Sequence, residues 1–129
     1  MAMPRLLALH PVLMARDVAE SVAFYERLGF HASFADDSAA PRYAGVRRDG
    51  VEFHLQWADA SQWAHAGDRP VLRLLCEGVD ALFAELLAAG ITPCVTSPWG
   101  QPGDTPRGTR EFHLRDPGDN ILQFYAPRG

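Results

Sequence analysis

The feature that most constrains the fold of this chain is an internal repeat. One pattern occurs twice in 129 residues: an apolar strand, an amphipathic helix and three further strands. The two helices are expected at 17–29 and 78–90, and each ends at a glycine, which readily forms the left-handed turn after a helix. A chain of this length holds one domain, or two small modules that share a core. We therefore expect one α+β domain, residues 1–129, built from two βαβββ modules.

The first module is expected at about 5–57. Its first strand falls in the apolar run 6–14, but Pro11 removes a hydrogen bond from a sheet ladder, so we expect an edge or a bulge there. Asp17 is a suitable helix N-cap, with Glu20 three residues later as in a capping box. The other strands of this module are expected at 30–34, 43–47 and 51–57.

A linker at about 58–69 leads to the second module, at about 70–127. The linker shows no periodicity, whereas the module repeats the order of the first one. A loop rich in proline and glycine is expected at 97–107. The strands before it are expected at 71–76 and 91–95.

The chain closes with a strand, a turn and a strand. Phe112 and Leu114 alternate with Glu111 and His113, which is the pattern of a strand with one buried face. Asp116-Pro-Gly-Asp-Asn supplies the turn, because proline fixes φ and glycine and asparagine tolerate positive φ. We expect the polar face of this hairpin to carry function.

The composition excludes several classes of function. The formal net charge of −4 does not suit a nucleic-acid surface, which needs a basic patch. No apolar run approaches the roughly 20 residues of a membrane span, and residues 1–4 are too short for a signal peptide. A cytoplasmic protein is therefore expected, with Cys76 and Cys94 as buried free thiols.

Several segments resemble the vicinal oxygen chelate superfamily, which includes glyoxalase I, extradiol dioxygenases, and fosfomycin and bleomycin resistance proteins. The most specific segment, at 14–30, reads Met-Ala-Arg-Asp-Val-Ala-Glu-Ser-Val-Ala-Phe-Tyr-Glu-Arg-Leu-Gly-Phe. Tyr43-Ala-Gly-Val-Arg-Arg-Asp-Gly, Arg110-Glu-Phe and Arg115-Asp-Pro are most similar to the bleomycin resistance branch. The resemblance implies an incomplete barrel around a cleft. It also implies a homodimer, because a second chain often completes such clefts.

Metal-dependent members of the superfamily carry ligands at four positions. In this chain those positions correspond to His10, His54, Val71 and Gln123. Valine cannot ligate, and the neutral amide of glutamine leaves a divalent cation without a compensating charge. Glu52 and Glu111 are nearby carboxylates, but neither is at a matching position. We therefore expect no metal, no other cofactor and no catalytic residue.

The same face is instead expected to contact a small molecule. Arg73 is the one charge in an apolar strand, and it either extends to the sheet edge or faces the cleft, paired with Glu111 or a ligand anion. Trp63 and Trp99 lie in long loops, where they cover a dimer partner or stack on a planar ligand, as Tyr43 also could. The residues expected to contact the ligand are His10, Tyr43, Glu52, His54, Gln56, Trp63, Arg73, Trp99, Glu111, His113 and Gln123.

Two functions of different classes follow from these residues. The first is a metal-independent protein of the bleomycin resistance type, which sequesters an amphipathic aromatic or cationic ligand in a dimer cleft. The alternative is a metal-dependent lyase or dioxygenase that acts on a vicinal oxygen substrate. The broken ligand set favours the binding protein. A half-buried histidine with no ligand role remains open for each of the histidines named above.

Overall fold

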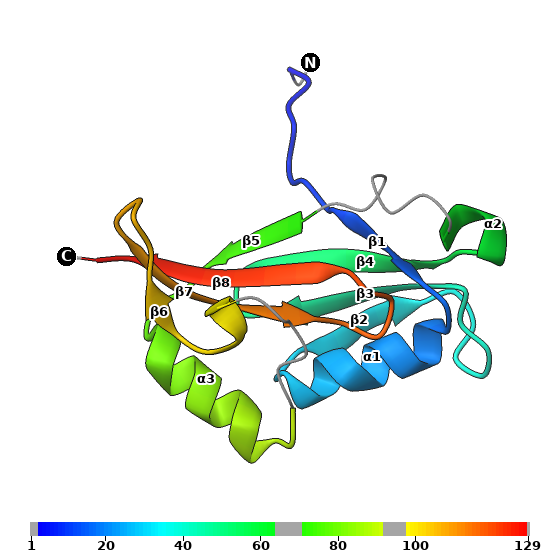
Figure 1. Ribbon diagram of the computed structural model, residues 1–129. Coiled ribbons are helices and arrows are strands. Elements are labelled where there is room, and N and C mark those ends of the chain that lie inside the picture. Colours follow the sequence, from blue (N-terminus) through cyan, green and yellow to red (C-terminus); the bar gives the residue numbers. More distant parts are fainter. Residues whose placement is uncertain (1–2, 64–70, 92–97, 129) are drawn as a thin grey trace.

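The structure of the protein is a computed structural model that describes residues 3–63, 71–91 and 98–128. Its strands form two four-stranded sheets, and each sheet comes from one half of the chain (Figure 1). The two longer helices lie along one side of the sheets (Figure 1). Neither sheet closes into a barrel, and the predicted α+β fold class is confirmed.

Sheet A belongs to the first half of the chain. It contains β1 (Val12–Ala15), β2 (His31–Ala35), β3 (Tyr43–Arg48) and β4 (Val51–Trp57) in the order β1-β4-β3-β2. The β1 strand runs parallel to β4, and the other pairs are antiparallel. Between β1 and β2 the chain forms α1 (Val18–Arg27).

Sheet B repeats this arrangement. It contains β5 (Val71–Leu75), β6 (Gly103–Asp104), β7 (Thr109–Arg115) and β8 (Ile121–Pro127) in the order β5-β8-β7-β6. Again the first and last strands are parallel, and α3 (Val79–Ala88) follows the first strand. The repeat expected from the sequence is therefore present in the fold. Two shorter elements are α2 (Ala60–Trp63) and the 3₁₀ turn η2 (Pro98–Gly100).

The helix α1 begins and ends where the sequence indicates. The side chain of Asp17 accepts a hydrogen bond from the backbone N–H of Glu20, at 3.1 Å, which satisfies a donor that a helix N-terminus leaves free. The helix buries Val18, Tyr25 and the following Leu28 against sheet A. Gly29 then takes a φ of 86°, a backbone conformation that favours glycine.

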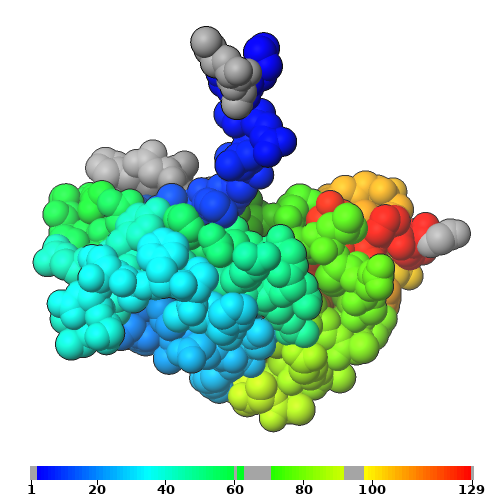
Figure 2. Space-filling model, turned by 180° about the vertical axis from the view of Figure 1, so that it is seen from behind, coloured from blue at the N-terminus to red at the C-terminus, as the bar shows by residue number. Residues whose placement is uncertain are grey.

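The first strand is shorter than the apolar run that predicts it. It starts only after Pro11, and residues 3–9 extend away from the body of the protein (Figure 2). Pro11 has no N–H to donate, but its carbonyl accepts a hydrogen bond of 2.8 Å from His54 N–H. The expectation of a strand over 6–14 is therefore wrong for its first half.

The second half of the chain differs from expectation before its hairpin. Ile91 is buried but lies outside any strand, and the rest of the strand expected at 91–95 falls outside the described residues. The second strand of sheet B is instead β6, within the stretch expected to be a loop. Cys76 is a free thiol, as expected, but it is half-buried rather than buried, and Cys94 lies outside the described residues.

The core lies between the inner faces of the sheets and the two longer helices. Phe112 pairs with Phe124 and Leu114 with Leu122 across the closing hairpin, and all four side chains are buried. This is the pairing that the alternation predicts. Within the described segments, no helix has both the length and the apolar character that spanning a bilayer requires.

A buried hydrogen bond ties the two halves together. The hydroxyl of Tyr25, on α1, donates to Asp116 Oδ2 at 2.6 Å, and Asp116 begins the β7–β8 turn. Asn120 of the same turn donates to the backbone carbonyl of Met14 on β1, at 2.8 Å. The closing hairpin is therefore fixed to both β1 and α1.

We expect Tyr25→Phe to lower the free energy of unfolding by about 1–3 kcal/mol, because the buried Asp116 loses a hydrogen-bond donor. Urea unfolding followed by circular dichroism measures the change. Tyr125→Phe is the matched control, since it also removes one tyrosine hydroxyl, and it should stay within about 0.5 kcal/mol of the wild type. Equal destabilisation by both variants would show that the Tyr25–Asp116 hydrogen bond contributes no more to stability than the hydroxyl of Tyr125 does.

Candidate functional site

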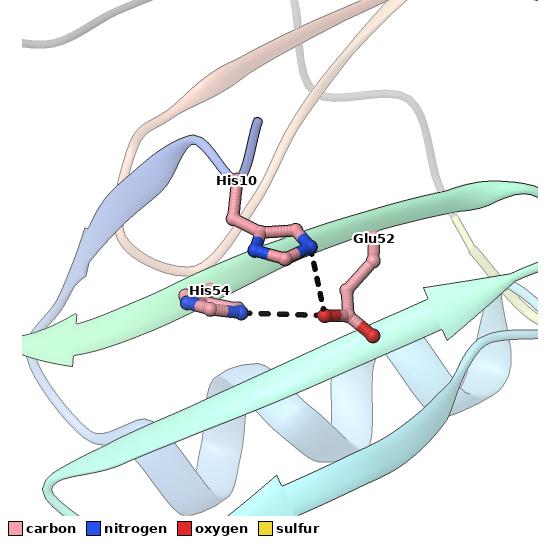
Figure 3. A group of neighbouring side chains, drawn as sticks. All are labelled: His10, Glu52 and His54. Atoms are coloured by element: carbon pink, nitrogen blue, oxygen red, sulfur yellow. Dashed lines mark hydrogen bonds and ion pairs between the residues drawn. The ribbon is translucent and has the colours of Figure 1, made fainter. Parts of the chain in front are cut away.

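Two histidines and a glutamate converge beside sheet A (Figure 3). Glu52 and His54 project from the same face of β4, because they are two residues apart, and His10 reaches them from the chain just before β1. Glu52 Oε2 lies 3.2 Å from His10 Nε2 and 3.4 Å from His54 Nε2. We call these three residues the histidine–glutamate cluster.

Aromatic rings surround this cluster. The rings of His10 and His54 are stacked, with centroids 4.7 Å apart. Tyr43, on the neighbouring strand β3, has its hydroxyl 2.8 Å from His54 Nδ1. Phe34, on β2, contacts His54 edge-on at 5.0 Å and stacks on Tyr43 at 5.9 Å. Since 43% of Phe34 is exposed, this is an aromatic surface open to solvent.

The carboxylate of Glu52 is held in its ionised form. Its partial burial favours the neutral acid, but hydrogen bonds from His54 and Ser33 and the charge of His10 outweigh this, so the pKa of Glu52 lies below its usual value. The side chain is 19% exposed, so an anion remains within reach of solvent. The histidine–glutamate cluster thus combines a carboxylate with two imidazole rings.

A second group of polar side chains is built into sheet B. Glu111, on β7, has no exposed surface, and its carboxylate accepts bonds of 2.8 Å from Arg107 and 2.7 Å from Thr109. His113 Nε2 lies 2.8 Å from it and Arg73 NH2 lies 3.3 Å from it. We call these five residues the Glu111 network. Both Glu111 and His113 are buried, so the face of β7 expected to line an open cleft is covered by the protein itself.

The side chain of Arg73, on β5, contacts two side chains of the neighbouring strand β8. It donates to Gln123 Oε1 at 2.7 Å, and its guanidinium lies 4.1 Å from the ring centroid of Tyr125. Of the two orientations that the sequence leaves open, the structure has the one paired with Glu111. Because β5 and β8 are parallel and place Arg73 opposite Gln123, the pairing is a consequence of register.

The hydrogen bonds of the Glu111 network overcome the cost of burying its charge. Burial alone would raise the pKa of Glu111, but hydrogen bonds from His113, Thr109 and Arg73 lower that pKa to about 2. The carboxylate is therefore charged at neutral pH. Two arginines surround it, which is how proteins accommodate buried charges.

Three further residues expected to contact a ligand are Trp99, Gln56 and Trp63. Trp99, in η2, is half-buried with its ring 6.1 Å from that of His113. Gln56 is exposed on β4, two residues beyond His54. The side chain of Trp63 lies outside the described residues. The structure therefore places Tyr43 with the histidine–glutamate cluster, and Gln123 and Trp99 beside the Glu111 network.

The sequence did not single out Phe34 and Arg107, which belong to these groups, and it placed Tyr125 only on the polar face of the closing hairpin. Phe34 is an exposed aromatic residue on a strand, and the sequence alone could have indicated it as a candidate for ligand contact. Arg107 lies in the loop rich in proline and glycine, and it forms an ion pair with the buried Glu111. Tyr125 sits under Arg73, and only the parallel register of β5 and β8 brings the two together.

An open cavity of about 540 Å³ lies elsewhere, between the β3–β4 turn, β5 and α3. Its lining is mostly apolar and includes Leu28, Leu75 and Phe124. Arg48 and Glu85 also line it, but they are already paired with each other at 2.8 Å. None of the residues expected to contact a ligand lines this cavity, so we base the candidate site on the two polar groups.

A model of the Glyoxalase/Bleomycin resistance protein/Dioxygenase superfamily matches residues 8–124. The chain belongs to this superfamily. A search of the curated proteins gives no significant match.

Solved structures of superfamily members resemble the chain over nearly its whole length. The bleomycin-binding protein of bleomycin-producing Streptomyces verticillus, in complex with copper(II)-bleomycin, is 31% identical with a TM-score of 0.74, and the match covers 98% of this chain and 99% of that one. A bleomycin-binding protein in complex with bleomycin is 20% identical with a TM-score of 0.75, over 95% and 100% of the two chains. A bleomycin resistance determinant encoded on the transposon Tn5 is 19% identical with a TM-score of 0.71, over 95% and 98%.

The superfamily's four metal-ligand positions do not fit a metal in this chain. Gln123 is already the acceptor of a hydrogen bond from the Arg73 guanidinium, so a second cation there would be repelled. Val71 has no donor atom. Of the remaining two positions, His54 is on β4 of the other sheet and His10 lies just before β1.

Glu111 should give the protein a marked sensitivity to acid. Its folded-state pKa of about 2 lies below the usual 4.5, so its contribution is complete above about pH 4.5 and is lost as the pH falls toward 2. We expect Glu111→Gln to destabilise the protein at neutral pH by on the order of 1–3 kcal/mol and to flatten the pH dependence in this window. Urea unfolding at a series of pH values measures both effects. Glu26→Gln, at an exposed glutamate of α1, is the control and should keep the wild-type pH profile.

Proposed function

We propose that the protein binds and sequesters a small amphipathic molecule with an aromatic or cationic part, in the cytoplasm and without help from a metal. The histidine–glutamate cluster and the aromatic rings around it are the primary contact surface. Trp99 and the outer face of Arg73, at the edge of the Glu111 network, add stacking and hydrogen-bonding groups. The ligand class follows from the chemistry of these residues.

The observation that carries this proposal is the exposed aromatic surface on sheet A. Phe34, Tyr43 and His54 are in mutual ring contact, and Glu52 lies next to them with an ionised carboxylate. Aromatic faces attract planar rings and cations, and a nearby carboxylate strengthens the attraction for a cation. Exposure of an aromatic ring on a strand to water is also unfavourable in free energy, and a bound ligand would cover that ring.

Two further facts support the same ligand class. The chain carries a formal net charge of −4, which favours approach of a cationic molecule. The bleomycin-binding protein of S. verticillus, 31% identical to this chain, is in complex with copper(II)-bleomycin. Bleomycin is therefore the first ligand to test. The alternative, a metal-dependent lyase or dioxygenase, is not favoured, because Arg73 holds Gln123 at one of the four ligand positions.

We also propose that the protein is a homodimer. The arm of residues 3–9 carries Leu6, Leu7 and Leu9, which are 100%, 82% and 86% exposed (Figure 2). Three such strongly exposed leucines within one short segment favour burial against another surface. The edge strand β5 exposes Val71 and Leu75 as well. A second copy of the chain is the occupant that we propose for this apolar surface.

Bleomycin should quench the tryptophan fluorescence of chelator-treated protein in a saturable manner, with one or two ligands per dimer. Trp99→Ala should remove much of the quenching and weaken binding roughly 3- to 10-fold, as expected when an aromatic contact worth about 0.5–1.5 kcal/mol is lost. Fluorescence titration measures both quantities.

The matched control for this experiment is Trp57→Phe. Trp57 is a half-exposed tryptophan at the end of β4, whose ring is covered by Arg42 at 4.1 Å. Its replacement should change the total fluorescence but not the affinity. Absence of saturable binding by the wild type, or binding that appears only when a metal is added back, would contradict the proposal.

The dimer has its own test. Light scattering at micromolar concentration should give twice the 14.2 kDa mass of the chain, and the double substitution Leu6→Asp, Leu7→Asp should give a monomer. Leu87→Asp, at a half-exposed leucine of α3, is the control and should leave the mass unchanged. A monomeric wild-type protein would refute the dimer.

A further inference from the structure

We propose that the histidine–glutamate cluster binds one divalent transition-metal ion through His10 Nε2, Glu52 Oε2 and His54 Nε2, with zinc as the best-suited ion. This site differs from the superfamily's four-position arrangement. All three ligands come from the first half of the chain, and Glu52 is at a position that the four-position pattern does not use. The inference does not rest on the proposed binding of an organic ligand.

The distances within the cluster fit a metal ion. Zinc binds imidazole nitrogen and carboxylate oxygen at about 2.0–2.1 Å, so ligands at the corners of a tetrahedron are about 3.4 Å apart. Glu52 Oε2 lies 3.2 Å from His10 Nε2 and 3.4 Å from His54 Nε2. All three ligand atoms lie within 4.8 Å of one another. The two imidazole rings are stacked in the absence of metal, so one of them has to tilt and shift before both Nε2 atoms can bind the same ion. The side chain of His10, which is 38% exposed, is the one that we expect to move.

The ligand types are also suitable. Two neutral imidazoles and one carboxylate form a ligand set that zinc enzymes use with a fourth position left for water. Glu52 supplies the negatively charged ligand that the four-position set lacks. Figure 3 shows both ring nitrogens directed at the same carboxylate oxygen. A metal ion bound by the three atoms would replace the contacts of Glu52 with His10 and His54, each of which now requires a proton on the imidazole nitrogen.

The surroundings hold the ligands in place. Metal-bound histidines usually donate their second ring N–H to an acceptor, and metal-bound carboxylates usually accept a hydrogen bond. Tyr43 Oη lies 2.8 Å from His54 Nδ1, and Ser33 donates to Glu52. Phe34 also contacts the His54 ring edge-on. Two of the three ligands thus have an outer partner.

The Tyr43 hydroxyl can form a hydrogen bond with His54 both with and without a bound metal. Without metal, His54 Nε2–H donates to Glu52, and the free Nδ1 accepts a hydrogen bond from the tyrosine hydroxyl. With metal on Nε2, the proton moves to Nδ1, which donates to the same tyrosine oxygen. A hydroxyl can both donate and accept, so the exchange of tautomers leaves no group unpaired.

The Glu111 network does not offer an equivalent site. It contains one histidine and one carboxylate, and Arg73, Arg107 and Thr109 already donate to the carboxylate oxygens. Two guanidinium groups beside these oxygens repel a metal cation. The histidine–glutamate cluster has no arginine among its contacts in the described part of the chain, which is why the two groups differ.

Calorimetric titration of chelator-treated, dialysed protein with Zn²⁺ should give one site per chain. Glu52→Gln and His10→Ala should each weaken binding by at least about 10-fold, the lower end of the loss seen even for outer partners of metal ligands. Tyr43→Phe should weaken binding by about 10- to 100-fold through loss of the acceptor for His54. His31→Ala, which removes an exposed histidine from the same sheet, is the matched control and should bind zinc as the wild type does.

Co²⁺ gives a second readout that does not depend on affinity. Bound to this cluster with one water, it should show the strong visible absorption of a tetrahedral ion, and Glu52→Gln should abolish that spectrum. Absence of Zn²⁺ binding by the wild type would overturn the inference. So would binding that Glu52→Gln and His10→Ala leave unchanged, which would place the ion elsewhere. Circular dichroism of each variant separates loss of the site from loss of the fold.

The histidine–glutamate cluster takes part in both proposals, but the two experiments can be told apart. Bleomycin binding is measured on metal-free protein through Trp99, which lies beside the Glu111 network, whereas zinc binding is measured without any organic ligand. Failure of one experiment therefore leaves the other standing. Zinc binding with no bleomycin binding would support the metal site alone, and the reverse result would support the binding protein alone.

Discussion

The buried carboxylate of Asp116 is the point on which the arrangement of the two halves depends. Its Oδ1 accepts hydrogen bonds from the backbone of Gly118 and Asn120, at 2.9 and 2.8 Å, and its Oδ2 accepts from Tyr25. Burial raises the pKa of Asp116, and these hydrogen bonds oppose the rise. Burial of a carboxylate this deep in the protein is unfavourable in free energy unless all its hydrogen-bond partners are present. The contacts among the closing hairpin, α1 and β1 therefore form together or not at all.

The same joint explains the residues of the β7–β8 turn. A Cβ at Gly118 would collide with the carbonyl oxygen of Met14, so only glycine lets the turn approach β1. Asp119 takes a φ of 65°, which aspartate tolerates better than most residues. Asn120 then bridges to Met14. The turn is therefore shaped by a contact with the other half of the chain as much as by the hairpin that it closes.

The two polar groups have different capacities for binding. The Glu111 network is saturated, because its carboxylate has four neighbouring donors from within the protein. Such a network fixes side chains in one arrangement and leaves little to offer a ligand except the outer face of Arg73 and the nearby Trp99. The histidine–glutamate cluster is more exposed, and its imidazoles can exchange a proton for a metal ion. New interactions are therefore expected first on sheet A.

Local patterns in the sequence were sufficient for much of the fold. The caps of α1, the alternation in β4 and the closing hairpin all follow from residues within one or two turns of chain, and the repeat places them in two modules. The sequence could not show that both faces of β7 are buried, because Arg107 and Arg73 come to Glu111 from other segments. The same holds for the site. Alternation puts Glu52 next to His54, but only the position of Pro11 against β4 brings His10 to them.

That position links the candidate site to the N-terminal arm. Pro11 is fixed to β4 by the hydrogen bond from His54 N–H, and His10 is the next residue toward the arm. The backbone of His54 thus anchors the base of the arm, while its ring faces the side chain of His10 at 4.7 Å. Any partner that orders the arm restricts His10 as well, and any ligand or ion that holds His10 restricts the arm. Because such coupling is reciprocal in binding free energy, occupancy of the cluster and burial of the arm should each favour the other when both need the same position of His10.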